Sequence, residues 1–262
     1  MGRYGAATDA AAVMFPILHG FPSLLAIAAM FCGMGFGGSL QATAIVTALV
    51  IGSIAATMGV SYLLSRTVLK GKPSSFVLEL PPYRRPQLGK ILVRSLIERT
   101  AKVLVRAVVV AAPVNLLIWV LANCHLQGQS LLQYGAEMLA PLGNVMGLDG
   151  TLLLAFVLGL PANEIILPIA MTGYTGAAQL LDYSSAQSLH SLLTSCGWDR
   201  ITAVCFLIFM MFHAPCATTL LTVQKETRSL RCTLVAWILP LAIGVMLCMA
   251  ANALLTLCGL GG

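Results

Sequence analysis

Charged residues are scarce in this sequence. Asp, Glu, Lys and Arg together make up 9% of the 262 residues, whereas apolar residues make up 58%. A water-soluble domain carries roughly a quarter of its residues as charged side chains, because its surface must be solvated. The scarcity of charge therefore excludes a soluble globular domain and predicts a chain that is surrounded largely by lipid.

Two other features are missing. The eight cysteines form no C-x-x-C pair, so neither a zinc ribbon nor a dithiol redox module is indicated. No segment alternates apolar and polar residues as a barrel strand does, which leaves helices as the spanning structure and makes the expected fold all-α. Apolar runs of about 20 residues, the length of a spanning helix, are instead plentiful. The candidate spans are 11–33, 41–65, 103–123, 151–172, 201–223 and 233–257.

The basic residues are unevenly distributed. Residues 124–150 and 173–199 contain no Lys or Arg, whereas ten of the fifteen lie within 66–106. The positive-inside rule therefore predicts that 66–106 and the smaller basic cluster at 225–231 are cytoplasmic, and that the two segments without basic residues are outside. The candidate span at 151–172 must then enter and leave on the outer face. We predict a re-entrant or broken helix there.

The basic segment divides the chain. We expect N-terminal transmembrane helices in 1–65, a basic cytoplasmic loop with an interfacial helix in 66–102, and a transmembrane region with broken helices in 103–262. In the loop, apolar residues recur near helical spacing among Lys and Arg, as in a helix lying on anionic headgroups. A docking surface for a soluble cytoplasmic partner is the alternative. So much hydrocarbon-facing sequence argues against nucleic-acid binding.

The stretch "LGLPANEIILPIAM" at 158–171 places Asn163 and Glu164 between Pro161 and Pro168 inside an apolar run. Proline interrupts a helix, and unwound backbone in a membrane is tolerated where it lines a cavity or is buried in protein. An ionisable residue near the bilayer centre costs at least ~2.5 kcal/mol, which favours a functional role for Glu164. Capping of a half-helix by Glu164 is the alternative, and capping does not exclude ligation.

A second stretch, "MFHAPCATTLLTVQKET" at 211–227, places His213 and Cys216 around Pro215. Paired, interrupted apolar segments indicate the midplane site of a transporter. Carboxylate, amide, imidazole and thiol groups together suit a divalent first-row transition ion, and the residue types do not distinguish among Fe²⁺, Mn²⁺, Zn²⁺ and Co²⁺. We therefore predict metal contacts from Glu164, Asn163, His213 and Cys216. For His213 and Cys216 the alternatives are an interior hydrogen bond and simple packing.

Three motifs, "KGKPSSFVLELPPYRRP", "GLPANEI" and "FHAPCATTLLTVQKET", together with their spacing, resemble the C-terminal membrane region of the FeoB family of bacterial ferrous iron transporters. The resemblance covers about residues 66–240. It implies a multi-pass importer of the bacterial cytoplasmic (inner) membrane, with Fe²⁺ as the transported ion. It also implies a pore made partly by two gate-like helical repeats, and a GTP-binding domain that regulates or drives passage.

The sequence departs from the family in two places. It contains no G-x-x-x-x-G-K-[ST] motif, so we expect no nucleotide binding and no enzymatic activity from these residues. The family's first gate carries Gly-Cys-x-x-Pro, whereas the stretch "GFGGSLQA" at 35–42 has Gly38 and Gln41 at the Cys and Pro positions. We therefore expect the second half of a split or truncated transporter. Its expected partners are membrane lipid and a separate half bearing the G domain, and a homo-oligomer is left open.

Two other functions are kept as alternatives. One is a permease subunit for a polar organic solute such as a nucleoside, because gate-like broken repeats resemble those of nucleoside transport. The other is a membrane scaffold that recruits a cytoplasmic GTPase through residues 66–106. Metal-dependent binding would separate the first alternative from iron transport. Charge reversal in 66–106 that abolished partner binding while transport persisted would exclude the second.

Overall fold

The structure is a computed structural model that describes residues 27–31, 36–66, 89, 101–126, 128–161, 163–176 and 186–258. Within these ranges the long elements are all helices, as expected, and the strands β1 (His125–Leu126) and β2 (Gln129–Ser130) form a small antiparallel pair. The helices are α3 (Phe36–Arg66), α5 (Lys102–Asn123), α6 (Leu131–Val145), α7 (Gly150–Leu158), the 3₁₀ helix η2 (Asn163–Ile165), α8 (Ile166–Thr175), α9 (Ala186–Ser195), α10 (Arg200–Phe212), α11 (Ala217–Thr227) and α12 (Leu230–Leu257).

The helices make this a multi-pass membrane protein. Among the described residues, Leu40–Val60 and Leu230–Leu257 are each able to cross a membrane by length and composition, and the number rises to four if two bent helix pairs each count as one span. The predicted spans 41–65, 103–123 and 233–257 correspond to α3, α5 and α12. The predicted span 11–33 and the interfacial helix of the basic loop lie largely outside the described residues.

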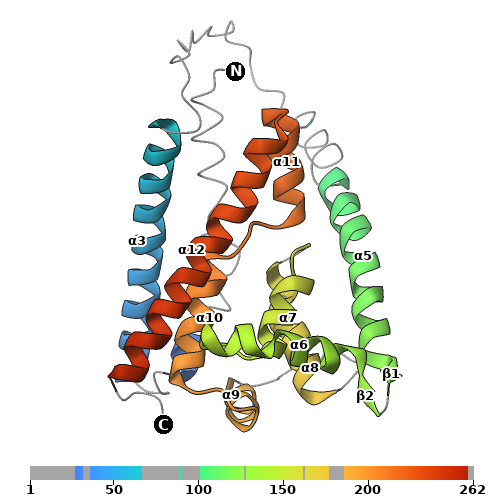
Figure 1. Cartoon of the computed structure of the whole chain (residues 1–262), viewed down its shortest axis with the longest axis vertical. Helices are drawn as coiled ribbons and strands as arrows, with labels where there is room; N and C mark the ends of the chain where they lie inside the picture. The colour runs from blue at the N-terminus through green and yellow to red at the C-terminus, as the bar shows by residue number, and fades with distance from the viewer. Residues whose placement is uncertain are drawn as a thin grey trace, which may run out of the picture.

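The long helices connect two opposite ends of the molecule (Figure 1). The end of α3, the start of α5 and the turn between α11 and α12 lie at one end, and α6, α9 and the β1–β2 pair lie at the other. Arg66 at the end of α3 and the basic residues at the turn between α11 and α12 are therefore on the same side of the fold. This arrangement supports the predicted topology, in which that end faces the cytoplasm.

Two sharp bends lie at the opposite end and were not predicted from the sequence. The axis turns by 108° between α6 and α7, and by 106° between α9 and α10. Each bend follows a glycine with positive φ, Gly147 at 72° and Gly197 at 90°, which is backbone that side chains other than glycine rarely adopt. Helices α6 and α9 both lie in segments that the charge pattern predicts only as outer connections.

The same hydrogen-bond motif makes both bends. The amide of Leu148 donates to Gly143 O at 2.9 Å, and the amide of Trp198 donates to Leu193 O at 3.0 Å, so each helix ends in a Schellman motif. An aspartate then caps the next helix. Asp149 Oδ1 accepts from the amide of Leu152 and Asp199 Oδ1 accepts from the amide of Thr202. The segments that begin at α6 and at α9 are therefore similar repeats.

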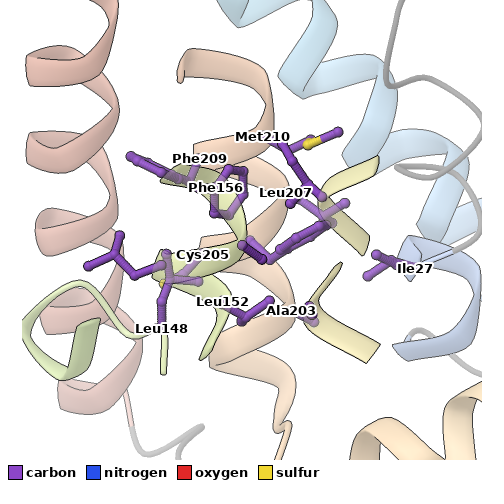
Figure 2. Packing of buried hydrophobic residues seen from close by; sticks show 14 of the residues in the cluster. Ile27, Leu148, Leu152, Phe156, Ala203, Cys205, Leu207, Phe209 and Met210 are labelled. Atoms are coloured by element: carbon purple, nitrogen blue, oxygen red, sulfur yellow. The ribbon is translucent and has the colours of Figure 1, made fainter. Parts of the chain in front are cut away.

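Helix α10 lies in the middle of the hydrophobic core, against α12 and α3. Its Phe209 ring meets Phe156 of α7 edge-on, with 4.6 Å between ring centroids (Figure 2). On the α12 side, the Gly244 position lies so close that an added Cβ would stand 3.0 Å from Phe212 O. The close approach buries most of α10, whereas many apolar side chains of α3, α5 and α12 are exposed, as expected of helices that face lipid.

Helices α6 and α7 pack through Gly150. A Cβ at this position would stand 1.9 Å from Ala136 O, and backbone cannot move aside as a flexible side chain can. We predict that Gly150→Ala separates the two helices and lowers the free energy of unfolding by about 3 kcal/mol, at the upper end of overpacking costs. The control is Gly52→Ala in α3, where nothing lies within 4 Å and no loss is expected. Thermal melts of the purified variants in detergent measure both, and equal melting temperatures would contradict the packing.

Candidate functional site

The first predicted break is present between α7 and α8. Helix α7 ends at Leu158, residues 159–161 form a turn, and η2 leads into α8. Gly159 is required there, because a Cβ would stand 2.3 Å from Ile166 Cγ1. Pro161 has no amide hydrogen with which to continue the helix. The break therefore lies where the paired prolines predict it.

The chain reverses direction at this break. Helix α8 returns beside α7, so a Cβ on Gly173 would stand 2.5 Å from Thr151 Cγ2. The Tyr174 hydroxyl at the end of α8 donates a hydrogen bond to Asp149 at the start of α7. Residues 149–174 thus form a helical hairpin that ends where it began, with its tip at the break (Figure 1). This geometry supports the predicted re-entrant segment.

The second predicted break is present between α10 and α11. Helix α10 ends at Phe212, and residues 213–216 are extended. Helix α11 begins at Ala217 with Cys216 as its N-cap, so the new helix starts two residues beyond Pro215. The segment 199–227 continues toward the end of the molecule that carries the basic residues instead of turning back (Figure 1).

The two breaks adjoin. The amide of Ala217, at the start of α11, donates to Leu160 O in the first break at 2.9 Å. The His213 ring lies 5.5 Å from the Phe156 ring of α7, measured between centroids. Each break therefore satisfies part of the unwound backbone of the other, which allows both in an apolar interior.

Two buried acceptors at the breaks have no hydrogen-bond partner. His213 is 2% exposed, and its Nδ1 lies 2.9 Å from Met210 O. A carbonyl only accepts, so Nδ1 carries the proton and the neutral ring presents a lone pair at Nε2. Among the described residues, His213 Nε2 and Asn163 Oδ1 are the buried side-chain atoms without a partner. Both belong to the predicted ligand set.

The other two predicted ligands lie on the same breaks. Cys216 is half-buried, and its Sγ lies 3.0 Å from Thr219 Oγ1. Glu164 lies in η2, but its side chain is outside the described part of the structure. The described side chains include no group of three or more His, Cys, Asp or Glu able to hold a metal ion. A closed structural metal site is therefore not formed by those side chains.

One polar cluster was missed in the sequence. The Tyr174 hydroxyl, besides bonding Asp149, accepts from Trp198 Nε1 at 2.9 Å. Burial, reinforced by the charge of Asp149, raises the pKa of Tyr174, so the phenol keeps its proton and remains a donor. The repeated G-x-D pattern at 147–149 and 197–199 was the available signal, since it marks both bends. It does not identify Tyr174 as the partner.

Comparisons with known proteins agree with the motifs. The family model "Ferrous iron transport protein B C terminus" matches residues 46–97, and the Gate model, described as "Nucleoside recognition", matches residues 104–230. The "Fe(2+) transporter FeoB" of Methanocaldococcus jannaschii is 26% identical over 77% of this chain and 30% of its own length. The protein of the same name from Staphylococcus aureus strain MSSA476 is 28% identical over 85% of this chain and 33% of its own length.

This chain thus spans about a third of the length of the curated relatives it matches. No solved structure matches it. The two family models together cover most of α3, most of the basic segment, nearly all of α5 and the helices from α6 to α11, including both breaks. The chain therefore carries a FeoB C-terminal domain and a Gate domain and is similar to distant FeoB transporters.

Proposed function

We propose that this chain provides part of the Fe²⁺ permeation path of a ferrous iron importer in the bacterial inner membrane. The observation that carries the proposal is the pair of buried acceptors, Asn163 Oδ1 and His213 Nε2, at two adjoining breaks. A buried polar atom without a partner costs about 1–3 kcal/mol, so its retention calls for a ligand. Two unpartnered acceptors, with no unpartnered buried donor among the described side chains, suit a cation.

The chemistry of the groups favours Fe²⁺ over Mg²⁺. The tautomer of His213 leaves Nε2 as the metal-binding nitrogen while Nδ1 is held by a backbone carbonyl, as in metal-ligating histidines. Imidazole and thiol are borderline to soft ligands, whereas Mg²⁺ prefers oxygen and dehydrates reluctantly. Asn163 and His213 would supply an amide oxygen and an imidazole, with Cys216 on the softer side. We propose that Glu164 adds the negative charge.

Ligation that stays incomplete is consistent with transport. A closed tetrahedral set holds an ion as a structural site does, whereas a permeation path must release it. Cys216 Sγ lies 3.0 Å from Thr219 Oγ1, so the thiol already has a hydrogen-bond partner in the protein. We propose that Fe²⁺ exchanges only part of its water shell at the two breaks.

We propose that the rest of the transporter corresponds to the parts of the relatives that lie outside the region matched by this chain. The relatives are about three times longer than the matched region. We propose that a G domain and the first half of the membrane path, in a separate polypeptide or elsewhere in a longer one, complete the importer. The basic residues at the end of the molecule near Arg228 face the side on which a cytoplasmic G domain would lie.

A nucleoside-like solute is the second candidate. The description of the Gate model favours it, and half-helix ends bind polar organic groups as well as ions. Uptake of radiolabelled Fe²⁺ that nucleosides fail to compete would exclude this candidate. Uptake of a nucleoside without any divalent cation would favour it over iron.

The charge of Glu164 is tested by Glu164→Gln in the complete reconstituted transporter. Glutamine keeps the shape of the side chain and removes its charge. We predict that Fe²⁺ uptake falls by about tenfold or more, because even about 1.4 kcal/mol of lost attraction corresponds to a factor of ten. Expression and membrane insertion should stay close to wild type.

Cys216→Ser is predicted to lower Fe²⁺ uptake less than Glu164→Gln and to relax selectivity toward harder ions such as Mg²⁺. The control is Cys124→Ser, at an exposed cysteine beyond the end of α5, which should change neither property. If Glu164→Gln and Cys216→Ser both transport Fe²⁺ at wild-type rates, the acid is a structural cap and the cysteine is packing.

Asn163→Leu tests whether the unpartnered Asn163 Oδ1 has a functional or a structural role. Replacing the unpartnered amide by an apolar side chain of similar size should leave the melting temperature unchanged or higher while Fe²⁺ uptake is lost. The matched control is Asn252→Leu on α12, because Asn252 Nδ2 donates to Asn144 O and Val145 O at 3.3 and 3.1 Å. That variant should lower the melting temperature and keep uptake. A destabilised Asn163→Leu variant with normal uptake per folded molecule would contradict the proposal.

A further inference from the structure

The Tyr174 hydroxyl links the base of the hairpin 149–174 to the second repeat. It donates to Asp149 Oδ2 at the start of α7 and accepts from Trp198 Nε1, which lies directly before the N-cap of α10. One hydroxyl therefore closes the hairpin and attaches it to the neighbouring repeat. We call these two hydrogen bonds the base junction.

The base junction is not needed to cap a helix. Asp149 caps α7 with Oδ1 and uses Oδ2 for Tyr174, so its two oxygens have separate partners. Asp199 makes the equivalent cap on α10, with Oδ1 2.7 Å from the amide of Thr202. Among the described residues, no side-chain hydrogen bond is seen from Asp199 to the first repeat. The bond to Tyr174 thus distinguishes Asp149 from its counterpart.

The hairpin is attached to the second repeat by hydrogen bonds at two places. At the base, Trp198 bonds Tyr174, and at the tip, the amide of Ala217 bonds Leu160 O. Between these places the contact is apolar, with Phe156 against the aromatic rings of α10 (Figure 2). Apolar contact is not directional, so it permits rocking that hydrogen bonds at both ends prevent.

We propose that Tyr174, Asp149 and Trp198 are positioning residues that set, from the far end of the hairpin, where Asn163 lies relative to His213. With the base junction intact, the tip is held against the second break and the two buried acceptors keep a fixed spacing. With it removed, the hairpin pivots about the bond between Ala217 and Leu160, and the spacing varies. The part of the proposal that concerns iron affinity rests on the proposed function, and the part that concerns the hairpin does not.

Hydrogen–deuterium exchange on the complete protein in lipid nanodiscs tests the hairpin itself. Tyr174→Phe keeps the ring and removes the hydroxyl. We expect amide exchange at 159–165 and 213–217, far from the substitution, to rise about fivefold, the effect of one lost hydrogen bond on local opening. Asp199→Asn, which retains an N-cap oxygen, should leave exchange at these residues unchanged. Exchange confined to the neighbourhood of Tyr174 would overturn the proposal.

Trp198→Phe provides a second test of the base junction in case Tyr174→Phe does not fold. It deletes the indole donor and keeps an aromatic ring against Phe31 and Phe206, which lie 6.0 and 5.3 Å from the indole between centroids. It should raise exchange at both breaks as Tyr174→Phe does. If Trp198→Phe is folded and leaves the breaks as protected as in the wild type, the base junction does not position them.

Iron uptake supplies the second readout. In a wild type that transports Fe²⁺, Tyr174→Phe and Trp198→Phe should raise KM about fivefold and change the maximal rate per folded molecule little, because a loosened site binds more weakly. An unchanged KM would overturn the positioning role. If the wild type takes up no Fe²⁺, the proposed function fails, and the exchange experiment still decides whether the base junction positions the breaks.

Discussion

The requirement that backbone amides and carbonyls be satisfied in an apolar interior determines the rest of this structure. A helix broken in the middle of an apolar run leaves such groups without partners, and lipid offers none. Here the two breaks lie against each other, and the amide of Ala217 meets the carbonyl of Leu160. A single break of this kind facing lipid would leave its backbone groups unsatisfied. The pairing of the breaks is therefore a condition of the fold as well as the origin of its polar site.

The same constraint limits the number and the kind of polar atoms that remain at the breaks. Among the described residues, the buried side-chain atoms that remain without a partner are the acceptors of Asn163 and His213. Hydrogen bonding of His213 to Met210 directs its lone pair away from its own helix end. The protein thus carries two unpartnered acceptors at the breaks, and the proposed divalent cation would satisfy both. We propose that the surrounding repeats, bent at Gly147 and Gly197, hold these breaks in place from the opposite end.

Much of the fold was predictable from the sequence, because lipid makes the relevant patterns simple. Apolar length located α3, α5 and α12, and the prolines at 161 and 215 located both breaks. The bends before α7 and α10 were not predicted, because the charge pattern indicates only outer connecting segments where α6 and α9 lie. Hydrophobic length carries no information about short helices that lie across the bundle axis, and only the repeated G-x-D pattern marks them.

The base junction was missed because Tyr174 and Trp198 are brought together by the return of α8, which is a property of the tertiary fold. Two of the four ligands predicted from the sequence, Asn163 and His213, have buried atoms without a hydrogen-bond partner. Their burial and the tautomer of His213 could be known only from the three-dimensional structure.

We propose that the adjoining breaks bind the transported cation through their two buried acceptors. Anomalous scattering of Fe²⁺ in crystals of the complete protein, grown without oxygen, measures this binding directly. One strong anomalous peak is expected between the Asn163 amide oxygen and His213 Nε2, and it should disappear in Asn163→Leu. Iron bound only elsewhere, or an unchanged peak in that variant, would exclude this site.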